Sequence, residues 1–125
     1  MGLRLHSVTF DCTDPGDLAE FWAAVTGYRV ESRSPFFAEL RGDGPDGGGF
    51  GPRMMFIQVP EAKAAKNRVH LDLGADDLDR EVDRVLGLGA ELVGRYEEWG
   101  VTWATFRDPG GNEFCIGHHP APGAS

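Results

Sequence analysis

The chain has 125 residues, of which 41% are hydrophobic and 26% are charged, so it is long enough for one compact domain that folds without disulfides or metal ions. Twelve basic and twenty acidic side chains give a net charge of −8, which argues against nucleic acid and membrane surfaces as partners. The first twenty residues contain no apolar stretch of the signal-peptide type. We therefore expect a cytoplasmic protein with reduced cysteines.

Two similar passages lie 63 residues apart in the sequence. Residues 7–10 align with residues 70–73, and Asp14 aligns with Asp77. In each half, a segment with alternating apolar residues leads, after an acidic residue, into a segment with helical spacing. This pattern indicates an internal repeat.

The first half predicts a strand, a helix and three further strands. The helix begins after the N-cap Asp14, has Pro15 in its first turn and ends at Gly27. We expect it to bury an apolar stripe formed by Leu18, Phe21, Trp22 and Val25. The predicted strands are residues 5–12, 28–33, 36–41 and 53–59.

The second half predicts the same order. Its helix is capped by Asp76 or Asp77 and ends at Gly89. We expect it to bury Leu78, Val82, Val85 and Leu86. The predicted strands are residues 69–73, 91–97, 101–107 and 113–117, with turns at residues 99–100 and 108–112. The fold class is therefore α+β, with two βαβββ modules in tandem.

Alternation along the strands predicts which side chains face away from the helices. The apolar sets, which should pack against the helices, are Val8, Phe10, Cys12, Val69, Leu71, Leu73, Phe114 and Ile116. The opposite sets are Ser7, Thr9, Asp11, His70, Asp72, Glu113 and Cys115. A sheet face with this many ionisable groups is either solvated or lines a pocket.

Three passages carry a family resemblance: VTFDCTDPGDLAEFWAAVTGY, PEAKAAKNRVHLDLGADDLDREVDRVLGLGAELV and FRDPGGNEFCI. Together they resemble the vicinal oxygen chelate superfamily, which includes glyoxalases, fosfomycin-type resistance enzymes, extradiol dioxygenases and bleomycin-resistance proteins. The resemblance implies a single glyoxalase-like domain over residues 1–119, with modules 1–60 and 67–119, a linker 61–66 and a tail 120–125. It also implies mixed sheets that curl into a cleft, and a homodimer.

The resemblance also implies where a metal would be held in metal-using relatives. The four ligand positions fall on Ser7, Gln58, His70 and Cys115, and a register shifted by one residue would replace Gln58 with Ile57. Only His70 is a strong ligand for a divalent ion, so we predict no family-type metal centre. The alternative is a distorted site for zinc, nickel, iron or manganese that uses His70, Glu113 and Cys115.

Aromatic residues on strand ends and loops predict the class of ligand. Six of them are not required by the helix stripes: Phe36, Phe37, Phe50, Tyr96, Trp99 and Trp103. Rings that line a pocket suit a flat or largely apolar compound. The predicted ligand contacts are Ser7, Gln58, His70, Trp99, Trp103, Glu113 and Cys115.

Three functions from different classes remain open at this point. The first is a metal-free protein that binds a small, partly aromatic compound. The second is a metal-dependent lyase or dioxygenase. The third is a metal-independent enzyme in which His70 acts as general acid or base, oriented by Asp72.

Overall fold

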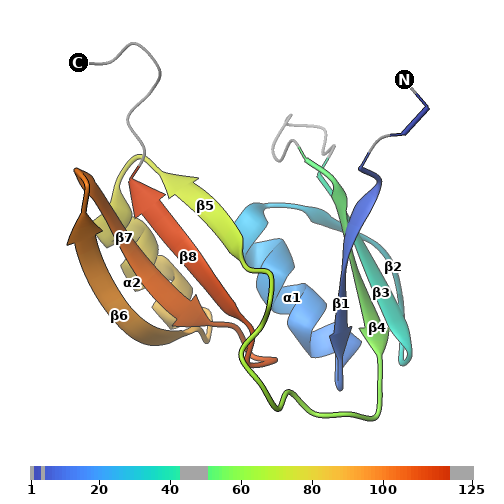
Figure 1. The fold of residues 1–125 in the computed structure, drawn as a ribbon. Coiled ribbons are helices and arrows are strands. Elements are labelled where there is room, and N and C mark those ends of the chain that lie inside the picture. Colours follow the sequence, from blue (N-terminus) through green and yellow to red (C-terminus); the bar gives the residue numbers. More distant parts are fainter. Residues whose placement is uncertain (1, 4, 43–50, 119–125) are drawn as a thin grey trace. The chain divides into compact units, whose positions relative to one another are not determined.

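The computed structural model describes residues 2–3, 5–42 and 51–118. The chain divides into two compact units, Met1–Lys63 and Ala64–Ser125, and this boundary falls inside the predicted linker. The first unit contains β1 (Ser7–Cys12), α1 (Pro15–Thr26), β2 (Arg29–Ser34), β3 (Phe37–Arg41) and β4 (Arg53–Gln58). The second contains β5 (Leu71–Ala75), α2 (Leu78–Gly87), β6 (Glu91–Glu98), β7 (Val101–Arg107) and β8 (Glu113–His118). The two predicted βαβββ modules are confirmed (Figure 1).

Helix α1 begins and ends as its sequence predicts. The carboxylate of Asp14 accepts a hydrogen bond from the backbone N–H of Asp17 at 3.1 Å, and Pro15 occupies the first turn, where its missing N–H costs nothing. Gly27 ends the helix in the left-handed conformation, with φ at 79°. The predicted buried stripe is confirmed in full: Leu18, Phe21, Trp22 and Val25.

Helix α2 uses the same device. Asp77 is the N-cap, and its carboxylate accepts from the backbone N–H of Arg80 at 3.1 Å. The helix ends at Gly87, two residues before the predicted stop, and Gly89 takes a φ of 112° in the loop that follows. The prediction that Leu86 is buried is wrong, because this side chain lies at the edge of the apolar stripe in the last turn and is 38% exposed.

The sheet of the first unit has the strand order β1-β4-β3-β2. Strands β1 and β4 are parallel, and the other two pairs are antiparallel. The ring of Phe10 lies 5.1 Å from that of Phe56 and 5.7 Å from that of Trp22, measured between centroids. These three rings join α1 to one face of the sheet, and the core of this unit lies there.

The sheet of the second unit repeats this topology with the order β5-β8-β7-β6. Strands β5 and β8 are parallel, and the other pairs are antiparallel. Four side chains that are at most 3% exposed fill the face toward α2: Ala104, Phe106, Phe114 and Ile116. The rings of Phe106 and Phe114 stack with centroids 5.3 Å apart. This packing leaves the alternate residues of the same strands on the opposite face.

Two turns set the register of β7 and β8. Trp99 and Gly100 form a two-residue hairpin loop, and both have positive φ, at 52° and 75°. The carboxylate of Asp108, which is 4% exposed, accepts from the backbone N–H groups of Gly110 and Asn112, each at 2.9 Å. Both predicted turns are confirmed, and the second delivers Glu113 to the start of β8.

The strand boundaries and one core assignment need correction. The first strand begins at Ser7 rather than Leu5, and β5 begins at Leu71 rather than Val69. Val69 is 77% exposed and does not belong to the core, because it precedes β5 and the alternation of the strand does not extend to it. The tail 120–125 and Phe50 lie outside the described residues.

Two further expectations concern the cysteines and the membrane. Cys12 and Cys115 are both thiols. Neither helix in the described part of the chain combines the length and the apolar character needed to span a bilayer.

Candidate functional site

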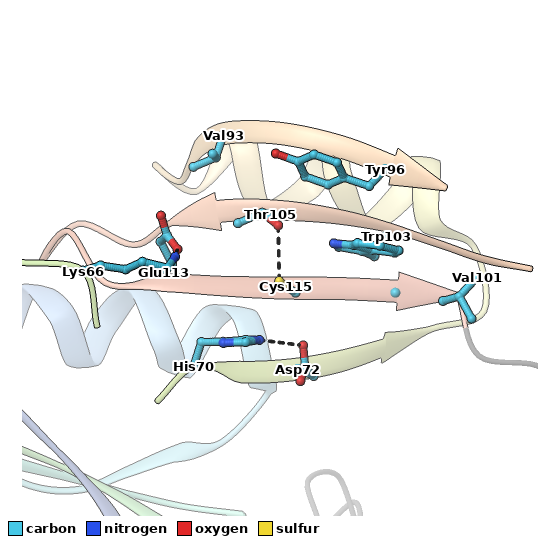
Figure 2. A pocket seen from close by; sticks show the side chains of 11 residues that line it. Lys66, His70, Asp72, Val93, Tyr96, Val101, Trp103, Thr105, Glu113 and Cys115 are labelled. Carbon is cyan, nitrogen blue, oxygen red and sulfur yellow. Dashed lines mark hydrogen bonds and ion pairs between the residues drawn. The ribbon is translucent and has the colours of Figure 1, made fainter. Parts of the chain in front are cut away.

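A pocket of about 620 Å³ lies on the second sheet, on the face opposite α2 (Figure 2). All of its lining belongs to the second unit. The lining residues are Lys66, His70, Asp72, Val93, Tyr96, Val101, Trp103, Thr105, Glu113, Cys115 and Gly117. Their positions follow from the strand alternation that buries Phe106 and Phe114 on the other face.

Strand register arranges the pocket in rows across the sheet. One row joins Asp72, Cys115 and Thr105, which are neighbours on β5, β8 and β7. The next row joins Gly117, Trp103 and Tyr96 on β8, β7 and β6. Gly117 has no side chain, so the floor between the two aromatic rings and β5 is left open.

Two aromatic rings form the apolar wall. Tyr96 and Trp103 are direct cross-strand neighbours, and their rings stack with centroids 5.5 Å apart and planes 29° from parallel. A side chain at Gly94 would bring its Cβ within 2.6 Å of the Tyr96 hydroxyl, so glycine at this position leaves room for the ring. We did not expect a role for Gly94, although a glycine within a strand is a known signal of such close contact.

Two pairs of polar side chains line the opposite side of the pocket. The His70 Nε2 atom lies 3.3 Å from Asp72 Oδ1, and Figure 2 shows the two side chains, from the residue before β5 and from β5 itself, pointing to the same side. Lys66 forms an ion pair with Glu113. His70 and Asp72, which we expected on one face, lie within reach of each other, whereas no sequence pattern distinguishes Lys66 from the other cations of the linker.

Asn67 fixes the start of β8 and was also missed. Its side-chain nitrogen donates to the backbone carbonyls of Val69, at 2.8 Å, and Glu113, at 3.2 Å. Its side-chain oxygen accepts from the backbone N–H of Glu113 at 3.2 Å. The pairing of β5 with β8 begins at Phe114, one residue after Glu113. The Asn67 amide therefore takes the place of a strand partner for Glu113.

Cys115 lies at the centre of the pocket floor, with its sulfur 3.3 Å from the Thr105 hydroxyl. Burial raises the pKa of the Cys115 thiol, and the negative charges of Asp72 and Glu113 raise it further. The hydrogen bond with Thr105 and the charge of Lys66 act in the opposite direction, but the net pKa shift is upward. The group is therefore a neutral thiol at physiological pH and a poor nucleophile.

The comparison with known families agrees with this architecture. The sequence profile described as the glyoxalase-like domain matches residues 7–117, which is most of the chain. The chain belongs to the glyoxalase-like domain family. The superfamily predicted from the sequence motifs is thereby confirmed. No curated protein matches the sequence.

Solved structures share the fold of this glyoxalase-like domain at low sequence identity. A glyoxalase/bleomycin resistance/dioxygenase family enzyme from Burkholderia phytofirmans PsJN has a TM-score of 0.74 and 22% identity, over 93% of this chain and 98% of that one. The E126Q mutant of the fosfomycin resistance protein FosX from Listeria monocytogenes, complexed with Mn(II) and 1S,2S-dihydroxypropylphosphonic acid, has a TM-score of 0.75 and 12% identity, over 97% and 93%. TioX from Micromonospora sp. ML1 has a TM-score of 0.64 and 21% identity, over 94% and 100%.

The manganese in one of these relatives raises the question of whether the glyoxalase-like domain here has suitable ligands. The ligand atoms of His70, Asp72 and Cys115 lie within 4.8 Å of one another. Manganese prefers oxygen and imidazole donors, whereas one of the three donors here is the soft sulfur of Cys115. These three residues do not fit a manganese centre. Glu113, which we placed in the alternative metal site, is outside this group of three and forms an ion pair with Lys66.

Three predicted contacts are not among the residues that line this pocket. Trp99 is at the tip of the β6–β7 hairpin, 89% exposed, and is not part of the pocket lining. Ser7 and Gln58 belong to the first unit. Gln58 pairs with the buried Cys12, so its side chain is on the face that packs against the helix. The residue of β4 that shares a face with Ser7 is Ile57. Our choice of Gln58 over Ile57 is therefore wrong by one residue.

Proposed function

We propose that this protein binds a small, flat, partly aromatic compound in the pocket on its second sheet, without a family-type metal centre. The observation that carries the proposal is the stacked pair Tyr96 and Trp103, which offers an aromatic wall beside an open floor. Tyr96 is 43% exposed and Trp103 is half-buried, so both rings keep surface that a ligand would cover. A compound stacked there gains from buried apolar area and from ring contact.

The polar side of the pocket supports the same proposal. A ligand that covers the rings also lies near His70, Asp72 and the Lys66–Glu113 pair, which together offer hydrogen-bond donors and acceptors. A mainly apolar pocket with a few polar groups at one side is the usual form of a small-molecule site. The volume of about 620 Å³ is sufficient for a compound of two or three fused rings.

Tryptophan fluorescence tests the proposal, because the chain contains three tryptophans in distinct environments. Flat aromatic compounds should quench the fluorescence saturably, and Trp103→Ala should weaken their binding by about 1–3 kcal/mol. Trp99→Ala is the matched control, since this residue lies outside the pocket lining and should leave the affinity unchanged. Binding that survives Trp103→Ala, or a panel of flat compounds without saturable quenching, would contradict the proposal.

A second candidate is a metal-independent enzyme that acts on a carbonyl or enol compound. The contact of 3.3 Å between His70 and Asp72 favours it, because a carboxylate that orients an imidazole is a common arrangement for general acid–base catalysis. Incubation with carbonyl compounds in heavy water, followed by proton NMR, would detect loss of the proton next to the carbonyl. His70→Gln should abolish that exchange, and exchange that continues in the variant would exclude His70 as the base.

We also infer that the protein is a cytoplasmic homodimer. The edge strands β2 and β6 expose backbone groups together with Val30, Leu92 and Val93, each at least 38% exposed. Exposed sheet edges of this kind are commonly covered by association, and two-fold symmetry is the most frequent solution.

A further inference from the structure

The charges around the pocket are not balanced. The acidic and basic side chains of the lining, apart from His70, are Lys66, Asp72 and Glu113. Lys66 and Glu113 form an ion pair, so their charges offset each other. The partner of Asp72 is His70, which is charged only when it is protonated. With His70 neutral, the pocket therefore has an excess of one negative charge, located at Asp72.

Asp72 is in position to meet a ligand. Its side chain is 65% exposed, and Figure 2 shows it on the pocket face of β5, with Trp103 on the pocket face of β7. The Asp72 position and the Trp103 position belong to adjacent rows of the same sheet face, with β8 between their strands. A ring system stacked on Trp103 would therefore extend over β8 toward the carboxylate of Asp72.

The aromatic wall favours a positively charged ligand, as the carboxylate of Asp72 does. The faces of tryptophan and tyrosine rings carry negative potential and attract cations. The chain as a whole has a net charge of −8, which raises the local concentration of cations and disfavours the approach of anions. The ring faces, the carboxylate of Asp72 and the net charge of the chain therefore all favour the binding of a cation.

From these observations we propose that the natural ligand is a flat aromatic compound that carries a positive charge on nitrogen, with its rings on Trp103 and Tyr96 and its charged nitrogen near Asp72. This inference rests on the proposed function and adds the charge of the ligand to it. Because Asp72 is exposed, its contribution to the binding free energy of a cation is moderate. The ring faces add a contribution of similar size. Together they predict a preference of about tenfold for a cation over a neutral compound of the same shape.

Three probes with one three-ring frame test the charge preference by equilibrium dialysis at slightly alkaline pH. They are 9-aminoacridine, which is cationic, acridine, which is neutral, and acridine-9-carboxylate, which is anionic. The cation should bind about tenfold more tightly than acridine, and the anion should bind most weakly. The preference should decrease as salt is raised, because the charges are exposed to solvent.

Two variants separate the carboxylate from the rings. Asp72→Asn should reduce the preference for 9-aminoacridine over acridine, measured as the ratio of the two affinities in the same variant, to about threefold. Asp79→Asn is the matched control, since this carboxylate pairs with Arg95 and is outside the pocket lining. It should leave all three affinities unchanged.

The outcomes distinguish this inference from the proposed function. If none of the three probes binds, the proposed function itself is contradicted. If all three bind with equal affinity and Trp103→Ala abolishes binding, the proposed function stands and the inference about charge is wrong. An unchanged preference in Asp72→Asn would also overturn the assignment of the charged nitrogen to this carboxylate.

Discussion

The side chain of Asn67 provides the most direct test of how the edge of the pocket is held in place. It makes three hydrogen bonds to the backbone, at 2.8, 3.2 and 3.2 Å, and two of these fix Glu113 from a position 46 residues earlier in the chain. Each such bond contributes about 0.5–1.5 kcal/mol net. The bonds are exposed or partly buried, so we expect Asn67→Ala to lower the free energy of unfolding by about 1–3 kcal/mol.

A second variant at this position sharpens the prediction. Asn67→Asp keeps the oxygen that accepts from the Glu113 N–H, but it places a second acceptor oxygen against the carbonyl oxygens of Val69 and Glu113. Its stability should therefore be equal to that of Asn67→Ala or lower. Lys63→Ala is the control from the same exposed segment and should change stability by less than about 0.5 kcal/mol. Denaturation in guanidinium chloride, followed by tryptophan fluorescence, measures all three variants.

The same variants should affect binding in a defined way. Asn67 places Lys66 and Glu113 beside the pocket, so its loss should weaken binding of 9-aminoacridine even at temperatures where the variant is fully folded. Lys63→Ala should bind as the wild type does. If the free energy of unfolding of Asn67→Ala is within about 0.5 kcal/mol of that of the wild type, the three hydrogen bonds do not stabilise the fold.

Three further predictions concern metal, assembly and cysteine chemistry. Protein purified without an affinity tag should contain well under one equivalent of zinc, nickel, iron or manganese, and chelator should leave its melting temperature unchanged; stoichiometric metal after dialysis would refute this. Light scattering should give a mass near 27 kDa, twice the chain mass of 13.6 kDa, and a monomer at micromolar concentration would refute the dimer. Because burial raises the pKa of Cys115, its alkylation at mildly alkaline pH should be slower than that of an ordinary exposed thiol, and should accelerate only at higher pH; mass spectrometry of the labelled peptide measures this rate.

Helix positions could be predicted because their signals are local. Asp14 and Asp77 each cap a helix by accepting a hydrogen bond from the N–H three residues later, and this pattern is visible within a few residues of sequence. Strand alternation likewise identified Phe114 and Ile116 as core and Glu113 and Cys115 as the opposite face. These features depend on neighbouring residues and on the alternation of side chains along a strand, and not on contacts between distant parts of the chain.

Features that depend on distant pairing could not be predicted. The choice between Ile57 and Gln58 depends on the register of β4 against β1, which are more than forty residues apart along the chain. Trp99 has the right chemistry for an aromatic wall, but the tight hairpin turn gives it a positive φ and leaves it exposed. The contacts of Asn67 with Glu113 are equally distant in sequence, and no local pattern marks them.

The repeat itself explains why this pocket lies on the second sheet. Ile57 on β4 pairs with Asp11 on β1, and the corresponding position in the second unit is Gly117, which pairs with Gly74. Two residues earlier on the same strands, Met55 on β4 corresponds to Cys115 on β8. Smaller side chains at both positions remove volume from the second sheet face while the buried face keeps its large residues. The repeated topology thus supplies the same framework twice, and the change from Ile57 to Gly117 leaves the space beneath the aromatic wall in the second unit.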